Sequence, residues 1–100
     1  MEIIKTVNED VTDIALVGRL DTTTAPDLEK ELKKLFEQGT SQLSLNFEQL
    51  DYISSAGLRV LLFAQKSLSE NGKMTIRNVK PEIMEVFEIT GFSDILTIEQ

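Results

Sequence analysis

Two short segments of this chain hold the side chains best suited to chemistry. The first is Ser54-Ser55-Ala56-Gly57, where two neighbouring hydroxyl groups stand before an apolar stretch. A serine at the start of a helix is most often an N-cap, which accepts a hydrogen bond from a free backbone N–H group. The same position also suits a phosphoryl group, because free N–H groups and the helix dipole favour an anion there.

The second segment is Asp21 followed by Thr22, Thr23 and Thr24. These residues could form a bare helix-capping loop, with the threonine hydroxyls as N-cap groups, or they could present an acidic group to a partner. An enzyme with Ser55 as nucleophile and Asp21 in support is disfavoured. The chain has no His to activate the hydroxyl, and no Lys stands in the serine segment to replace it.

The residue types that the chain lacks narrow its function further. The 100 residues contain no His and no Cys, which removes the usual general base, a thiol nucleophile, disulfides and nearly all zinc, haem and iron–sulfur sites. The net charge of −7 argues against a protein that tracks nucleic-acid phosphates. We therefore expect no catalysis, no metal, no cofactor and no direct nucleic-acid contact, but a module on which other proteins act.

The chain shows no signal for membrane insertion. Its first ten residues include acidic residues and no long apolar core, so they do not resemble a signal peptide. The longest unbroken apolar run, Val60–Ala64, is far shorter than the roughly 20 residues that span a bilayer. We expect a single domain over residues 1–100 in the cytoplasm.

Hydrophobic spacing predicts the elements that position the two segments. Strands are expected over residues 3–7, 11–20, 41–47, 74–79 and 95–98, with residues 49–55 as a connection. Helices are expected from Pro26 to near Gly39, from Ala56 to about Glu70, and over residues 81–90.

The alternation of strands and helices predicts a mostly parallel sheet joined by right-handed crossovers. Residues 41–47 and 74–79 alternate between apolar and polar side chains, unlike strands covered on both faces. We therefore predict an α/β fold of two layers, with a mixed, mostly parallel sheet. The helices lie largely on one face, and the chain advances as a short right-handed β-α superhelix.

The second predicted helix is unusual at its beginning. Residues 56–64 are apolar nearly all round apart from Arg59, which indicates burial at that end. Arg59 is either a solvated charge or a partner contact. Gly57 costs up to ~1 kcal/mol relative to alanine in a helix, so we expect a close approach or a tight turn there. Three acidic residues on the last helix form a solvated face or meet a basic partner: Glu82, Glu85 and Glu88.

The run DYISSAGLRVLL resembles the STAS domain of the anti-sigma-factor antagonists. Gly18-Arg19-Leu20-Asp21 and Val86-Phe87…Gly91-Phe92 extend the resemblance to about residues 2–98. It implies a partner-switching protein that, when unphosphorylated, binds an anti-sigma factor, usually a serine kinase of the GHKL type, and so releases a sigma factor. Phosphorylation disrupts this binding, and a metal-dependent Ser/Thr phosphatase restores it.

The resemblance also implies roles for single residues. Ser55, two residues before Gly57, corresponds to the phosphoryl acceptor, and Asp21 to the family's acidic residue beside it. Family members often have Asp where this chain has Ser54, and Ser or Thr in place of Ala56. Ser54 is therefore an alternative acceptor. The expected partner-binding residues are Asp21, Thr22, Thr23, Ser54, Ser55, Ala56, Gly57 and Arg59.

The physical effect of such a modification is local. A phosphate on Ser55 takes the net charge from −7 to about −9, and burying a dianion in an interface costs several kcal/mol without a cation. We expect an electrostatic and steric block with no change of fold. The alternative is a STAS-type binding or accessory subunit of a transport or signalling complex that has no phosphoswitch.

Overall fold

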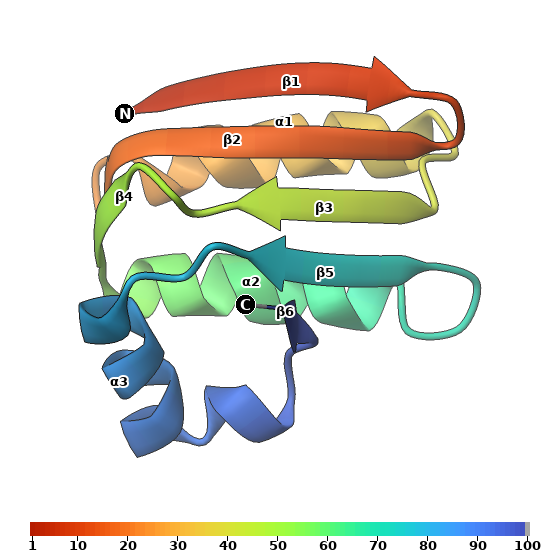
Figure 1. The fold of residues 1–100 in the computed structure, drawn as a ribbon. Helices are drawn as coiled ribbons and strands as arrows, with labels where there is room; N and C mark the ends of the chain where they lie inside the picture. Colours follow the sequence, from red (N-terminus) through yellow and green to blue (C-terminus); the bar gives the residue numbers. More distant parts are fainter. Residues whose placement is uncertain (100) are drawn as a thin grey trace.

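Six strands make one sheet, and helices α1 and α2 lie behind it in the view of Figure 1. The computed structural model describes residues 1–99. The strands are β1 (Glu2–Asn8), β2 (Val11–Leu20), β3 (Gln42–Asn46), β4 (Leu50–Ile53), β5 (Lys73–Arg77) and β6 (Ile98–Glu99). The helices are α1 (Ala25–Glu37), α2 (Ser55–Ser67) and α3 (Pro81–Thr90), followed by a 3-10 turn at Phe92–Asp94.

The strand order confirms the predicted architecture. The strands follow one another as β1-β2-β3-β5-β6, so the chain advances across the sheet in one direction. Only the β1–β2 pair is antiparallel among these neighbours, and the other pairs are parallel. With α1 and α2 on one side, the front of the sheet stays open (Figure 1), which explains why its strands alternate between apolar and polar side chains.

Strand β2 is long enough to pair with two different strands along one edge. Its first half, Val11–Ala15, pairs with β3, and its last residues, from Gly18 on, pair with β4. The change of partner falls at Gly18, which has a φ of +108° and donates its N–H to the carbonyl of Gln49 at 2.9 Å. A left-handed φ of this kind suits glycine, which has no Cβ to clash.

Strand β4 corrects the prediction that residues 49–55 form only a connection. Its exposure does not alternate: Leu50 and Ile53 are buried, whereas Asp51 and Tyr52 between them are exposed. This pattern arises because β4 is short and pairs only with the irregular end of β2. A strand of four residues without period-2 alternation gives no recognisable signal in the sequence.

The predicted bounds of several other elements also differ from the structure, and β5, for example, covers Lys73–Arg77 rather than residues 74–79. The last strand covers Ile98–Glu99 rather than residues 95–98. Ile95 belongs instead to the preceding turn, because the N–H groups of Ile95 and Leu96 both donate to the carbonyl of Phe92, at 3.0 and 2.9 Å. Helix α2 begins at Ser55, one residue earlier than predicted, and ends at Ser67 instead of Glu70.

The hydrophobic core lies between the sheet and the helices. Helix α1 buries one stripe of leucines, Leu28, Leu32 and Leu35, as its spacing predicts. The rings of Phe36 and Phe63 join α1 to α2 with centroids 5.9 Å apart. No helix within residues 1–99 is both long and apolar enough to cross a membrane.

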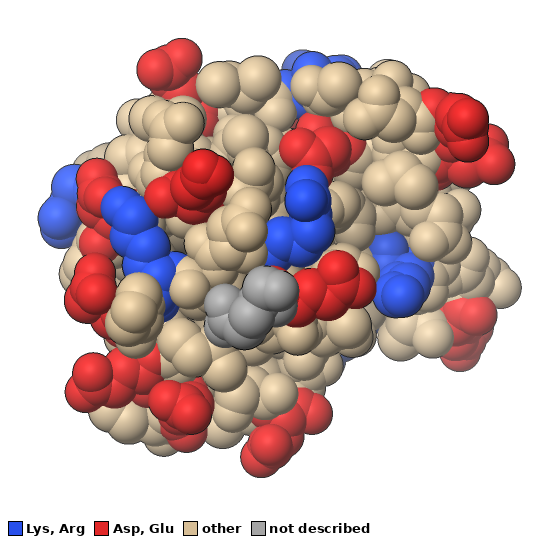
Figure 2. Space-filling model, in the orientation of Figure 1, with Lys and Arg blue, Asp and Glu red and all other residues tan. Residues whose placement is uncertain are grey.

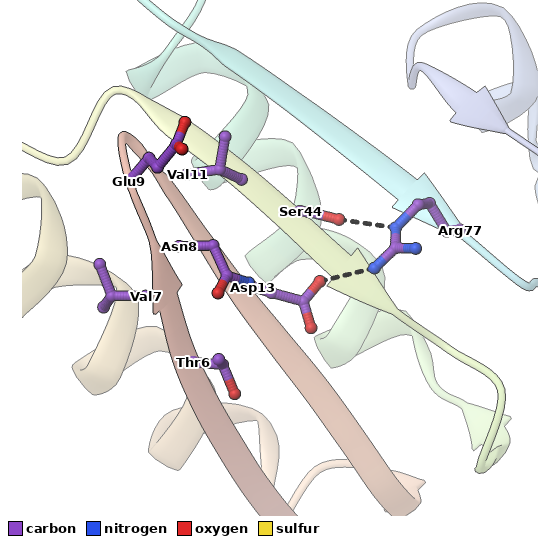
Figure 3. Close-up of a pocket in the computed structure, with 8 residues that line it drawn as sticks. All are labelled: Thr6, Val7, Asn8, Glu9, Val11, Asp13, Ser44 and Arg77. Atoms are coloured by element: carbon purple, nitrogen blue, oxygen red, sulfur yellow. Dashed lines mark hydrogen bonds and ion pairs between the residues drawn. The ribbon is translucent and has the colours of Figure 1, made fainter.

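On the open face of the sheet, the side chain of Arg77 connects three strands by hydrogen bonds (Figure 3). Arg77 on β5 donates from Nε to Ser44 Oγ on β3 and from Nη2 to Asp13 Oδ1 on β2, both at 2.8 Å. These residues lie beside a shallow depression of about 710 Å³ near the β1–β2 turn. Basic and acidic side chains are interspersed on this face (Figure 2). Sequence reasoning did not find this contact, because 64 residues separate Asp13 from Arg77.

Helix α2 packs tightly against the sheet at Gly57. A Cβ placed on this glycine would stand 2.8 Å from Leu20 Cγ and 2.9 Å from Ile53 Cγ1. Real Cβ atoms do not approach carbon so closely, so the packed side chains would have to shift. The close approach predicted from the sequence is confirmed, and it packs the first turn of α2 against β2 and β4.

Replacing Gly57 with alanine should therefore destabilise the protein, although alanine is the better helix former. Overpacking costs about 1–3 kcal/mol, and helix propensity offsets up to about 1 kcal/mol of that cost. We expect a net loss, measured as a lower free energy of unfolding in urea. The matched control is Lys66→Ala, an exposed change on the same helix, which should leave stability within about 0.5 kcal/mol. Equal stability of Gly57→Ala and the native chain would contradict the packing.

Candidate functional site

Ser54 is the N-cap of α2 and is tied to the sheet as well. Its backbone is extended, with φ −98° and ψ 174°, and its Oγ accepts a hydrogen bond from the N–H of Gly57 at 3.2 Å. Its carbonyl accepts from the N–H of Leu58, and its own N–H donates to the carbonyl of Leu20, both at 2.9 Å. Ser54 is half-buried, so its hydroxyl already has a structural task.

Ser55 has the opposite character. It is the first residue of α2 and is exposed, and its hydroxyl makes no hydrogen bond to the described residues 1–99. The first turn of α2 contains no acidic residue, so no side-chain carboxylate offsets the positive end of the helix dipole. The structure therefore separates the two serines: Ser54 caps the helix, and Ser55 presents a free hydroxyl.

The Asp21 segment is a turn held by its own carboxylate. Asp21 Oδ1 accepts from Thr23 Oγ1 at 2.7 Å, from the Thr23 N–H at 3.0 Å and from the Thr24 N–H at 3.1 Å. Thr24 is the N-cap of α1, but its side chain makes no capping bond to that helix. The expectation that threonine hydroxyls cap α1 is therefore wrong, because the Thr24 hydroxyl instead accepts from the Asp21 N–H and donates to the carbonyl of Arg19, both at 2.8 Å.

These hydrogen bonds favour the ionised form of Asp21. The Thr23 hydroxyl, with smaller effects from the backbone N–H groups, lowers the pKa of the carboxyl below its ordinary value. Arg19 lies nearby, with Nε 3.8 Å from Asp21 Oδ2, and its guanidinium stacks 4.1 Å above the ring of Tyr52. The segment thus carries a fixed negative charge next to a cation at the end of β2.

The two segments lie together because Leu20 connects them. The carbonyl of Leu20 accepts a hydrogen bond from the Ser54 N–H, and Asp21 is the next residue along the chain. A small depression of about 220 Å³ lies between α1 and α2 at this end, and Thr22, Ala56 and Arg59 are among the residues that line it. Of the predicted partner-binding residues, Gly57 is buried, so its contribution is to packing rather than to a surface contact.

The remaining predicted site residues are accessible. Thr22, Thr23, Ser55 and Arg59 are exposed, whereas Asp21, Ser54 and Ala56 are partly buried. Among residues 1–99, no group of three or more acidic side chains could hold a metal ion. The arrangement offers one free hydroxyl at a helix N-terminus, and the turn that begins at Asp21 is joined to this end of the helix through the Ser54–Leu20 hydrogen bond. Such a site can receive a phosphoryl group.

Replacing Thr23 with alanine tests the cause of the lowered pKa. Loss of the hydroxyl should raise the pKa of Asp21 towards its ordinary value, which an NMR titration of the carboxyl carbon can measure. A carboxylate with a lowered pKa stabilises the fold above its ordinary pKa, and this contribution is lost as pH falls through the folded value. Thr22→Ala, which removes no bond to Asp21, is the control. The same pKa in both variants would refute this origin.

Exchanging each serine for alanine tests the division of roles between them. Ser54→Ala removes the cap and should lower the free energy of unfolding by about 1 kcal/mol. Ser55→Ala removes an exposed hydroxyl without a partner and should change it by less than about 0.5 kcal/mol. Thermal or urea unfolding of both variants gives the comparison. If Ser55→Ala proves the more damaging change, the assigned roles are reversed.

Comparison with known proteins identifies the family of this chain. A model of the STAS domain matches residues 2–100. The protein named "Putative anti-sigma factor antagonist BtrV" of Bordetella bronchiseptica is 40% identical over 84 residues, covering 83% of this chain and 72% of BtrV. The anti-sigma-B factor antagonist of Staphylococcus aureus is 31% identical over 101 residues, covering 100% of this chain and 94% of the relative.

Solved structures agree with this result at the level of the fold. The anti-sigma factor antagonist SpoIIAA in its unphosphorylated form matches with a TM-score of 0.78 at 20% identity, covering 99% of this chain and 88% of SpoIIAA. The phosphorylated form of SpoIIAA from Bacillus matches with a TM-score of 0.77 at 22% identity, covering 99% of this chain and 92% of that one. This chain therefore belongs to the STAS-domain family.

Proposed function

We propose that this chain is an anti-sigma-factor antagonist that works by partner switching, with Ser55 as its phosphoryl acceptor. The observation that carries the proposal is the contrast between the two serines at the start of α2. The hydroxyl of Ser54 is occupied as the helix cap, at 3.2 Å from the Gly57 nitrogen. The hydroxyl of Ser55 is exposed and free, in the first turn of a helix that has no acidic residue there.

The names of its relatives support this function. BtrV and the Staphylococcus aureus protein are both named as antagonists of anti-sigma factors, and the second spans the whole of this chain. In the proposed cycle the chain is a binding protein and not an enzyme. The partners that it requires are an anti-sigma factor that is also a GHKL-type serine kinase, and a metal-dependent Ser/Thr phosphatase. We place the cycle in the cytoplasm, where ATP is available to the kinase.

The proposed docking surface combines the two segments at this end of the sheet. It consists of Asp21, Thr22 and Thr23 from the turn before α1, together with Ser54, Ser55, Ala56 and Arg59 from the start of α2. Its side chains carry both signs of charge, from the partly buried Asp21 and from the exposed Arg59. A kinase that docks here would contact both segments at once, and it would bury the Ser55 hydroxyl in the interface.

Phosphorylation would break such an interface by adding charge to its centre. The net charge of the chain would change from −7 to about −9, and the carboxylate of Asp21 adds to the local negative field. A decisive switch needs about a 10⁴-fold difference in affinity, or about 5.5 kcal/mol. Desolvation of a dianion without a cation from the partner costs several kcal/mol, so one contact can supply most of this difference.

The switch needs no change of fold on this account. The two forms of SpoIIAA match this chain almost equally well, with TM-scores of 0.78 and 0.77. A phosphate at a helix N-terminus is accommodated by free N–H groups and by the dipole, which favour it by about 0.3–1 kcal/mol. The modified chain should therefore stay folded, and the effect should appear in the affinity for the partner.

Incubation with the cognate kinase and ATP tests the proposal. We expect the native chain to gain the mass of one phosphoryl group on Ser55, as located by peptide mass spectrometry. Ser55→Ala should gain none and should stay bound to the kinase. Ser55→Asp carries a single negative charge, and it should bind at least about tenfold more weakly than the native chain, a loss of about 1.4 kcal/mol.

Ser54→Ala is the matched control, because it removes the neighbouring hydroxyl and leaves the proposed acceptor. It should still be modified at Ser55. If modification persists in Ser55→Ala but disappears in Ser54→Ala, the acceptor is Ser54 and not Ser55. If no modification occurs and the chain binds a transport or signalling complex constitutively, it acts as an accessory subunit without a phosphoswitch.

A further inference from the structure

Arg59 lies one helical turn after Ser55, on the same side of α2. Residues at positions i and i+4 of a helix have Cβ atoms about 5–6 Å apart. Helical side chains also lean towards the N-terminus of their helix, so a long side chain covers the turn before its own Cα. Both residues are exposed, so the guanidinium of Arg59 can reach a group attached to Ser55 without displacing any core side chain.

The structure leaves Arg59 available for such a contact. Arg19 pairs with Asp21 and Arg77 pairs with Asp13, but Arg59 has no ion pair with the described residues. The acidic residue that shares its depression is Glu29 of α1, whose Oε2 lies 3.2 Å from Lys33 Nζ. Of the three arginines in the chain, therefore, only the one beside Ser55 has no carboxylate partner within residues 1–99.

We propose that Arg59 is an internal clamp for the phosphate on Ser55. This inference rests on the proposed function, because it assumes that Ser55 is the acceptor. A guanidinium can donate two parallel hydrogen bonds to a phosphate, which makes the contact specific in geometry as well as in charge. Phosphorylation then acts twice on the docking surface: it adds a dianion, and it withdraws Arg59 from any acidic group of the kinase.

The clamp can be tested without the kinase by incorporating phosphoserine directly at position 55 during synthesis. The readout is the second pKa of the phosphate, about 6 in the absence of partners, followed by ³¹P NMR. A nearby cation favours the dianion and lowers this pKa. Asp21 and Glu29 raise it, Arg19 beside Asp21 lowers it, and all three stay unchanged in every variant. Arg59→Gln should therefore raise the pKa by at least about 0.2 pH unit, from the usual strength of i,i+4 ion pairs.

Two further variants make the result specific to the clamp. Lys66→Gln removes an exposed cation of the same helix that lies seven residues further on, roughly 10 Å along the axis, so it should leave the phosphate pKa unchanged. Arg59→Lys keeps the charge and should restore part of the effect. An unchanged pKa in Arg59→Gln, or an equal shift in Lys66→Gln, would overturn the clamp.

The failure of the clamp is distinguishable from the failure of the proposed function. The same phosphoserine protein is mixed with the kinase, and its affinity is compared with that of the unmodified chain. Loss of binding together with an unchanged pKa in Arg59→Gln supports the switch and refutes the clamp. Equal affinity of the phosphorylated and unmodified chains refutes the switch itself, and with it any role of the clamp in switching.

Discussion

Contact between the first turn of α2 and the end of β2 determines where every residue of the proposed site lies. Gly57 allows the helix backbone to approach Leu20 and Ile53 more closely than any side chain would permit. The same approach lets the Ser54 N–H bond the carbonyl of Leu20 at 2.9 Å. The turn that begins at Asp21 is thereby held beside the start of α2, although the two lie about thirty residues apart in the sequence.

In the proposed function, the site contributes rigid positioning and charge, and other proteins carry out the chemistry. The capped helix holds the Ser55 hydroxyl in solvent, and the hydrogen bonds from Thr23 favour the ionised form of Asp21 in the neighbouring turn. With opposite charges on Asp21 and Arg59, the proposed docking surface would respond to one added phosphate. On the proposed function, a chain without His or Cys can serve as a switch, because a kinase and a phosphatase would provide the catalytic groups.

Much of this arrangement could be predicted from the sequence, because the signals involved are local. The leucine stripe of α1, the alternation of β3 and the cost of a glycine in α2 each identified a feature that the structure contains. Strand β4 was missed because its pairing depends on the end of β2, which no local pattern records. The roles of the two serines needed the structure, since the sequence does not show which hydroxyl accepts from the Gly57 N–H and which one stays exposed.

On the proposed function, phosphorylation of Ser55 acts at the surface of a fold that does not change. Backbone amide chemical shifts of the unmodified chain and of the chain with phosphoserine at position 55 test it most directly. This account predicts large differences confined to the start of α2 and the turn from Asp21 to Thr24, with β5 and α3 unaffected. Differences that extend through β5 and α3 would contradict it, because they would show that the switch reorganises the fold.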